Sequence, residues 1–511
     1  MTATTAGRAA SPPTLPMTRT QVALSSVGCL VTLLLSLLDT NIVGAVTYPM
    51  VRELDPVHGV AHLPWLVIGY TLADCVVLPI YGKLADTYGA KRIYLVALSV
   101  FIVGSALCGL SVNLTELIAF RTLQGIGGGG LISTTMVILG LLQRGSDQAD
   151  GKPGTMRTSM GGVMVGVGMA LGPTVGGIVA QHLGWRWAFY LNLPLAGIAL
   201  VIACTALRLP PVTSVRHRID LIGATLIAAA ATALLLVTEW GGKQYAWQSP
   251  VIIGLLVAGL VLLVAFFRRQ ATAAEPIIPL ALFRNTAFRL MSALSVFAGL
   301  GLTGSLVYLS LVNQLGRGMT VLQAGLWMLA MAAGFLAAAM VSGAILARWG
   351  KYRYLLVLGN ATTTVAMALF ALTTSSASWP LWLGTSLFLL GFGLGQNIGI
   401  GVTYAQNSVD VEYIGSATTA LRFLQQLGAA FGAALMGAIM NQLLSVRLTG
   451  AAAAANSDGQ LDTAIFTRLP AAAQHTIAAV FTTSVGTLFL ISAAIMVIPL
   501  VLSCFVTEPR R

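Results

Sequence analysis

The residues in this sequence that could do chemistry are ionisable side chains that interrupt long apolar stretches. Among the 16 Asp and Glu, Asp39 and Asp74 lie well inside such stretches, and the arginines Arg121 and Arg422 do so too. Charge is costly in hydrocarbon, so ionisable residues there usually belong to ion or proton pathways. Burial disfavours a carboxylate and a nearby Arg favours it. A conformational change that alters this contact can therefore load and release a proton.

Asp39 and Arg121 are expected at similar depths. At a helical rise of about 1.5 Å per residue, Asp39 lies roughly 12 Å and Arg121 about 8 Å below the outer surface. We therefore predict that Asp39 carries a proton and that Arg121 tunes its charge. Asp74 is expected near the midplane, where it binds a second proton or faces a cationic substrate. The alternative is that each aspartate only hydrogen-bonds a neighbouring helix. Arg422 either reaches the same region or extends to the inner surface.

The depths given for Asp39, Asp74 and Arg121 assume that the apolar stretches are helices within a membrane. The chain has 511 residues, of which 57% are hydrophobic and 9% charged, against about 25% charged in an average soluble domain. Apolar stretches of about 20 residues recur along the chain, which indicates membrane-spanning helices. A spanning β-barrel would need short alternating segments, and disorder would need low hydrophobicity. The sequence therefore predicts an all-α integral membrane protein.

We predict fourteen transmembrane helices from these apolar stretches. They cover residues 21–47, 61–81, 93–111, 115–141, 157–181, 187–207, 219–239, 250–267, 288–313, 322–346, 354–373, 380–405, 414–443 and 476–505. An even count puts both termini on one side of the membrane, and the distribution of Lys and Arg favours the cytoplasmic side of a multi-pass inner-membrane protein. Most of the 28 Lys and Arg then fall in cytoplasmic segments, as the positive-inside rule requires. The net charge of +12 is thus explained by topology, and the expected partners are membrane lipids rather than nucleic acid.

An internal repeat divides the chain. The loop from Gly82 to Arg92 shares both glycines and its final arginine with the segment from Gly343 to Arg353. Repeats of this kind are typical of secondary transporters, in which two bundles rock around a midplane site. We therefore expect two six-helix bundles plus two inserted helices. The predicted parts are a cytoplasmic tail (1–20), an N-terminal bundle (21–207), the insertion (208–287), a C-terminal bundle (288–506) with an external loop (444–475), and a second tail (507–511).

Five motifs lie in order along the predicted spans. They are Leu38-Asp39 with Ile42-Val43, the loop from Gly82 to Arg92, the stretch from Arg121 to Gly127, the glycine-rich stretch from Gly168 to Gly177, and the stretch from Trp185 to Pro194. With these motifs the chain closely resembles the major facilitator superfamily, and within it the fourteen-span drug:proton antiporter family. Asn41 and Gly44 depart from the family's first-span pattern, and Gln425 stands where relatives often have Arg.

The resemblance implies a gate in the first cytoplasmic loop. Gly82, Asp86, Gly89 and Arg92 would form a latch that holds the bundles together when the protein opens outward, with Asp86 accepting helix-terminal amides or an Arg. The alternative is a solvated charged turn that fixes topology. The second copy has Ala347 in place of the aspartate, which suggests an asymmetric latch.

The resemblance also implies a helix interface that limits proton leakage. Gly168, Gly172 and Gly176 recur at four-residue spacing around Pro173 and make a smooth helix face. Small residues let helices approach closely, so packing alone is the simpler interpretation.

Polar residues among apolar walls are candidates for substrate contact. They are Asn41, Tyr70, Gln124, Asn313, Gln314, Gln396, Asn397, Arg422 and Gln425. A few polar groups on apolar walls suit amphipathic drugs better than sugars. The same side chains could instead join neighbouring helices.

These features together predict a transporter and not an enzyme. We expect alternating-access efflux of hydrophobic compounds, cationic ones among them, from a monomer with the proton as coupling ion and no metal or cofactor. The glycines 127–130 lack the Lys-Ser or Lys-Thr of a nucleotide-binding loop, which disfavours an ATP-driven pump. The alternatives are a dedicated exporter of one antibiotic, metabolite or lipid, and, from another class, a channel or membrane receptor.

Overall fold

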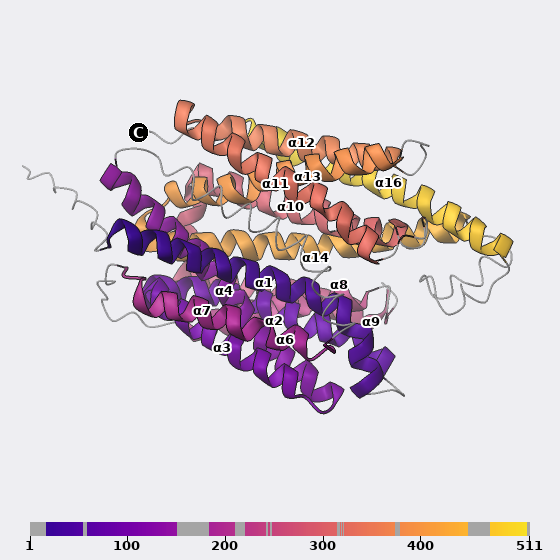
Figure 1. Ribbon diagram of the computed structural model, residues 1–511, viewed down its shortest axis with the longest axis horizontal. Coiled ribbons are helices and arrows are strands. Elements are labelled where there is room, and N and C mark those ends of the chain that lie inside the picture. Colours follow the sequence, from indigo (N-terminus) through magenta and orange to yellow (C-terminus); the bar gives the residue numbers. More distant parts are fainter. Residues whose placement is uncertain are drawn as a thin grey trace, which may run out of the picture.

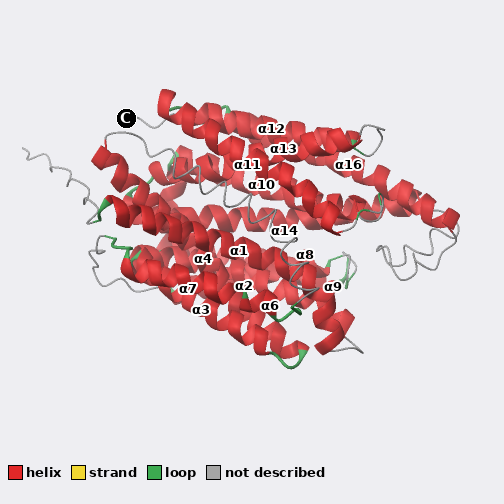
Figure 2. Ribbon diagram, in the orientation of Figure 1, coloured by secondary structure: helices red, strands yellow, loops and turns green. Residues whose placement is uncertain are grey.

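The computed structural model describes residues 17–54, 59–150, 183–209, 220–241, 244–245, 248–313, 317, 319, 321–373, 379–447 and 471–507. These residues are helical almost throughout (Figure 2). The described part has one β feature, an isolated bridge between Gly241 and Tyr245. The all-α class predicted from the sequence is therefore the class observed.

The N-terminal set of helices precedes the insertion. Its members are α1 (Arg19–Leu54), α2 (Gly59–Tyr88), α3 (Ala90–Leu110), α4 (Leu114–Asp150), α6 (Trp187–Tyr190) and α7 (Asn192–Thr205). Helix α4 packs against α2 and α3, and α1 packs against α4 and α7. Aliphatic and aromatic side chains such as Leu35, Phe101 and Ile138 fill the space between them. This packing brings α1 and α4, which contain Asp39 and Arg121, into direct contact.

The C-terminal set has the same architecture. Its members are α10 (Thr286–Leu311), α11 (Val321–Trp349), α12 (Tyr352–Leu372), α13 (Trp379–Asn407), α14 (Ile414–Arg447) and α16 (Ala471–Ser503). Short 3-10 turns, η1 (Leu280–Arg284) and η3 (Val411–Tyr413), precede α10 and α14. Helix α10 packs along α14, and α13 packs against α11 and α12. Helix α14 also contacts α2 and α4, so it lies between the two sets (Figure 1).

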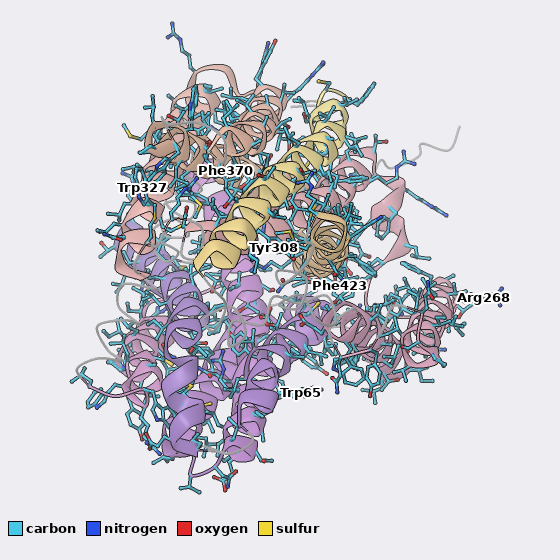
Figure 3. All side chains as sticks on the ribbon, turned by 90° about the vertical axis from the view of Figure 1, so that its right-hand side faces the viewer. Trp65, Arg268, Tyr308, Trp327, Phe370 and Phe423 are labelled. Carbon is cyan, nitrogen blue, oxygen red and sulfur yellow. The ribbon has the colours of Figure 1, made fainter. Side chains whose placement is uncertain are left out.

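Two further helices, α8 (Leu221–Trp240) and α9 (Pro250–Thr272), form the predicted insertion. Asp220 caps α8 by accepting from the Gly223 amide, and Ser249 caps α9 by accepting from the Ile252 amide, as N-cap residues do. Helix α8 packs on α9, α2 and α14. The pair lies at the side of the molecule, with Arg268 at its outer edge (Figure 3). The insertion thus borders the junction between the two sets without separating them.

The number of membrane spans differs from the prediction. Within the described residues, 12 helices are long and apolar enough to cross a membrane, and α10 contributes a shorter apolar stretch, Thr286–Gly301. Every predicted span overlaps a helix except 157–181, which lies outside the described residues. About twelve candidate spans are therefore found, and the count of fourteen stays a prediction.

Several boundaries differ as well. Helix α1 continues to Leu54 and α4 to Asp150, because a helix can extend beyond its apolar part and hydropathy marks only that part. The predicted span 187–207 is divided at Leu191 into α6 and α7. Within the predicted loop 444–475, α14 extends to Arg447 and α16 begins at Ala471, and residues 448–470 lie outside the described part.

The sequence repeat is also a repeat of turn geometry. Gly89 follows the end of α2 with φ 92°, and Gly350 follows the end of α11 with φ 61°. Left-handed backbone after a helix favours glycine because a side chain there would be strained. The same glycine turn therefore ends the second helix of each set and directs the chain into the next helix.

The two ends of the described chain lie close to the same loops. Val22 near the start of α1 shares a buried cluster with Ala85 and Ile414, and Tyr404 Oη donates to the Thr507 carbonyl at 2.5 Å. Figure 1 accordingly shows the start of α1 and the end of α16 at one end of the molecule. Both described ends share one side, and its assignment to the cytoplasm stays a prediction.

Candidate functional site: a buried ion pair and the contacts between two helical sets

Asp39 and Arg121 form an ion pair in the interior of the N-terminal set. Nη1 of Arg121 on α4 donates to Oδ2 of Asp39 on α1 at 2.9 Å, and the two side chains are 3% and 0% exposed. The depths inferred from the sequence thus correspond to direct contact. A charge pair this far from water persists only where further hydrogen bonds satisfy both partners.

Neutral side chains provide those further bonds to Asp39. Its Oδ1 accepts from Gln124 Nε2 at 2.9 Å and from Asn192 Nδ2 at 2.7 Å. Gln124 Oε1 in turn accepts from Arg121 at 2.8 Å. Ser105 Oγ accepts from both amides, at 3.1 and 3.0 Å, and donates to a carbonyl of α6. Helices α1, α3, α4 and α7 therefore meet in one polar network.

Asn192 and Ser105 were not among the residues singled out from the sequence. Asn192 belongs to the stretch from Trp185 to Pro194, so the motif was a usable signal. Ser105 gives no such signal, because hydroxyls inside spans commonly bond their own helix. Gln124 was expected at a substrate cavity and instead bonds the ion pair.

An aromatic ring covers the guanidinium. The Arg121 Cζ lies 4.1 Å from the ring centroid of Tyr70 on α2, a favourable cation–π distance. Arg121 Nε has no hydrogen-bond partner among the described residues. If Asp39 took up a proton, Arg121 would remain charged and would lose its principal partner. Neutralising Asp39 therefore changes the preferred packing around Arg121.

Asp74 connects the two sets near the middle of α2. Its Oδ2 accepts from Gln426 Nε2 on α14 at 2.7 Å, and Asp74 itself is 7% exposed. Arg422, one turn earlier on α14, attracts Asp74 electrostatically. The structure therefore brings Arg422 into the region of Asp74, one of the two positions that the sequence left open.

Asp86 makes a second connection at the end of α2. Its carboxylate accepts from the Gly415 amide at 2.7 Å and from the amide and hydroxyl of Ser416 at 2.6 Å each. These groups are the first turn of α14, where free amides and the helix dipole favour an anion. Asp86 of one set thus caps a helix of the other, in the geometry expected of a latch that uses helix-terminal amides.

Two glycines allow this cap. A Cβ on Gly82 would lie 2.9 Å from the Gly415 carbonyl oxygen, and a Cβ on Gly415 would lie 2.7 Å from the Gly82 carbonyl oxygen. Backbone at that separation leaves no room for a side chain. Gly82 therefore serves close approach, while Gly89 serves the turn described above.

The basic residues of this loop have other positions. Arg92 is exposed on α3, and no ion pair joins it to Asp86 in the described part of the chain. Lys83 Nζ instead pairs with Glu275 at 2.7 Å, which ties the segment after α9 to α2. Nearby, Gln406 Nε2 on α13 donates to the Met136 carbonyl on α4 at 3.1 Å. The two sets are therefore joined at several points around this loop.

A cavity lies where α4 faces the C-terminal set. Its walls come from α4, α10, α12, α13 and α14, and among the predicted substrate residues Asn397, Arg422 and Gln425 line it. Gln396 instead accepts from Ser342 Oγ at 2.6 Å, and Asn313 accepts from Arg317 at 2.5 Å. Both are therefore used in helix contacts.

Several predicted residues lie outside the described part. The structure does not describe the side chain of Asn41 or any part of Gln314. The same holds for the predicted interface residues Gly168, Gly172, Pro173 and Gly176. Among the described residues, no group of three or more His, Cys, Asp or Glu is placed to hold a metal ion.

Comparisons with known proteins identify the family. The Major Facilitator Superfamily model matches residues 28–220 and again 219–433. An uncharacterized MFS-type transporter of Mycobacterium tuberculosis is 32% identical over 455 residues, which are 87% of this chain and 64% of that protein. The multidrug transporter protein MdtP of Bacillus subtilis is 30% identical over 415 residues, or 81% of this chain and 74% of that one. The chain thus spans less than two thirds of the mycobacterial relative.

Solved structures agree on the fold. The human organic anion transporter MFSD10 has a TM-score of 0.58 at 16% identity, covering 93% of this chain and 99% of that one. The proton:xylose symporter XylE has a TM-score of 0.58 at 14% identity, covering 93% and 95%. At this identity the likeness concerns the fold alone. With both halves of the chain matched by one family model, the chain belongs to the Major Facilitator Superfamily, a superfamily of membrane transporters and not of enzymes.

Proposed function

We propose that this protein is a secondary active exporter that exchanges external protons for hydrophobic small molecules across the bacterial inner membrane. The observation that carries the proposal is the buried Asp39–Arg121 ion pair, whose hydrogen bonds join α1, α4 and α7. Charges are kept at such depth mainly for function. The multidrug names of two Bacillus subtilis relatives, 30% and 29% identical, favour efflux of hydrophobic compounds.

Asp39 is the proposed proton carrier. When its carboxylate is charged, Arg121, Gln124 and Asn192 all hold it. When it is protonated, the attraction to Arg121 is lost, and α1 and α4 can change their relative positions. The ion pair thus links proton occupancy to helix packing, which is the requirement for coupling.

Alternating access requires contacts between the sets that break and re-form. The described hydrogen bonds between the sets run from Asp74–Gln426 to Asp86–Gly415, toward the end that we predict to be cytoplasmic. This arrangement supports a conformer closed at that end. Opening inward would then require release of Asp86 from α14, with Gln406 leaving Met136.

The proposed unit of transport is a monomer in a lipid membrane. The ion pair, the latch and the cavity all belong to one chain. The proton is the only coupling ion in the proposal, and no cofactor takes part.

Proteoliposomes with an imposed pH gradient test the proposal. Naphthaleneacetate, naphthaleneacetamide and the lipophilic cation tetraphenylphosphonium are tested in turn. At least one of them should move uphill at the expense of the gradient, and Asp39→Asn should abolish this uphill movement. Asp410→Asn, which changes an exposed aspartate outside the network, is the matched control and should transport normally. Full coupling in Asp39→Asn would remove Asp39 from the mechanism, and gradient-independent leakage in the wild type would indicate a channel.

A panel of toxic compounds, tested with and without overexpression, separates broad from dedicated export. Protection against many unrelated hydrophobic compounds would support multidrug efflux. Protection against a single antibiotic, metabolite or lipid would instead identify a dedicated exporter.

A further inference from the structure

The cavity between α4 and the C-terminal set has a simple charge pattern. Among the described residues that line it, Arg422 is the single ionisable one. The other lining residues are apolar, such as Leu294 and Leu394, or neutral and polar, such as Ser133 and Asn397. The cavity wall therefore has one positive charge and no described negative charge.

The acid that balances this charge lies behind the wall. Asp74 attracts Arg422 from α2, yet Asp74 is not among the described lining residues. One of its oxygens is already engaged by Gln426 at 2.7 Å. No hydrogen bond from the Arg422 guanidinium is found within the described part. Arg422 therefore has donors to spare on the cavity side.

Phe423, the next residue on α14, has a different environment. It is not among the described residues that line the cavity. It belongs to a buried cluster that runs from the cavity wall at Leu294 to Ile227 of α8, and Figure 3 places it on α14 between the C-terminal set and the insertion. Arg422 and Gln425 line the cavity. Helix α14 thus gives an apolar residue to the insertion side and its cationic and amide residues to the cavity.

The opposite wall offers a second unsatisfied group. Ser133 on α4 is 1% exposed, lines the cavity, and its Oγ has no hydrogen-bond partner among the described residues. Buried polar groups are nearly always paired, so such a group needs an explanation. Asn360 and Asn397, joined at 3.3 Å, add neutral polar atoms to the same space. The cavity thus offers Arg422 from one set and Ser133 from the other to a bound ligand.

We propose that this cavity binds amphiphiles that have a carboxylate head and an apolar body, with Arg422 as the group that recognises the head. The inference rests on the proposed export function and names its substrate class. A guanidinium fork matches a carboxylate with two parallel hydrogen bonds, and the leucine and methionine walls hold the apolar body. A cationic compound in the same cavity would be repelled by Arg422.

Three ligands with one aromatic body test this assignment. Naphthaleneacetate, naphthaleneacetamide and naphthylmethylammonium differ in the charge of the head group, and their binding to the full chain in lipid nanodiscs can be measured by calorimetry. The wild type should bind the carboxylate about ten- to a hundredfold more tightly than the amide, the gain expected of a charged hydrogen-bonded pair. The ammonium compound should bind most weakly.

Variants locate the preference at Arg422. Arg422→Gln should abolish the preference for carboxylate over amide, and Arg422→Lys, which keeps the charge without the fork, should retain a reduced preference. Arg268→Gln is the matched control, because Arg268 is exposed at the outer edge of the insertion (Figure 3). The comparison among ligands in the wild type needs no variant, so a misfolded Arg422→Gln would not prevent the test.

Equal binding of the three ligands, or an unchanged preference in Arg422→Gln, would overturn the assignment. Uphill export of naphthylmethylammonium without carboxylate binding would overturn this inference and leave proton-coupled export standing. Carboxylate preference without any gradient-driven export would support this inference and overturn proton-coupled export.

Discussion

At the scale of single residues, the Asp39 carboxylate depends on neutral donors as well as on Arg121, because its Oδ1 accepts from both Gln124 and Asn192. Asp39 and Arg121 stand out because hydrocarbon penalises charge, so a short census of acids finds them. Asn192 donates to the Asp39 carboxylate, and Ser105 accepts from Gln124, which also holds that carboxylate. Amides and hydroxyls within a span are common, however, and have many other uses. Their role appears only when four helices are packed together.

Asn192→Leu tests the neutral support of Asp39. The substitution keeps the approximate size but removes the 2.7 Å bond to Asp39 Oδ1 and the 3.0 Å bond to Ser105. We expect the free energy of unfolding to fall by about 1–3 kcal/mol, seen as a lower Tm in detergent, and the ratio of substrate to protons moved to drop. Asn407→Leu, at an exposed residue, should change little. A wild-type Tm and ratio in Asn192→Leu would show that Arg121 and Gln124 hold the carboxylate unaided.

Glu53, near the end of α1 at Leu54, gives a pH-dependent test outside the candidate membrane spans. It lies beyond the candidate span Arg19–Thr40 of α1, and it accepts from Trp185 Nε1 at 2.8 Å and from Arg186. The hydrogen bonds from Arg186 and then Trp185 hold the pKa of Glu53 below its usual value. A lowered pKa means that the stabilisation is present above the ordinary glutamate pKa of about 4.3 and is lost as pH falls through the folded-state value.

The measurement is Tm against pH for the wild type and Glu53→Gln. The wild type should be the more stable at neutral pH, and the difference should shrink in acid below the ordinary glutamate pKa. The effect is small because the Glu53 side chain is 53% exposed and water screens the pair. A difference that stays constant down to low pH would assign the effect to packing.

At the scale of helices, the repeat was predictable and the contact between repeats was not. Gly89 and Gly350 recur in the sequence and adopt left-handed backbone at equivalent turns, because that conformation nearly requires glycine. The helix that Asp86 caps could not be identified from the sequence, since Gly415 lies in the other set. Local geometry is encoded locally, whereas a contact between distant helices depends on how whole bundles dock.

Gly415→Ala tests the docking of α14 on α2. The added methyl would lie 2.7 Å from the Gly82 carbonyl oxygen and would collide with Asp86, so the latch should fail to close. Access is measured at Thr418→Cys, on the cavity wall, in a protein whose exposed Cys204 and Cys504 are replaced by Ser. In inside-out vesicles, an impermeant maleimide should label this cysteine several-fold faster when Gly415→Ala is present. Gly197→Ala is the control, because a Cβ there meets nothing within 4 Å. Unchanged labelling would mean that Asp86 and Gly415 do not govern access.

At the scale of the whole molecule, the described hydrogen bonds between the two sets are distributed unevenly. They connect α2 with α14 and α4 with α13, and they extend from Asp74 to the loop that holds Asp86. Lys83 adds the segment after α9 through Glu275. Hydropathy could predict the helices, because each span is apolar along its own length, and the sequence repeat could predict their division into two sets. It could not predict the contacts between the sets, since they depend on single polar residues at chosen depths.

The common location of the two chain ends leads to a prediction about orientation. Val22 belongs to the same buried cluster as Ala85 and Ile414, and Tyr404 donates to the Thr507 carbonyl, so both described ends lie near the loops that contain Asp86 and Gly415. Because Lys and Arg favour the cytoplasmic side, and this end holds Lys83, Lys91 and Arg92, fluorescent-protein fusions at either terminus should fluoresce in the cytoplasm. Alkaline phosphatase fused at either terminus should be inactive. Active phosphatase at one terminus alone would require an odd number of spans, and activity at both would reverse the orientation and place the latch outside.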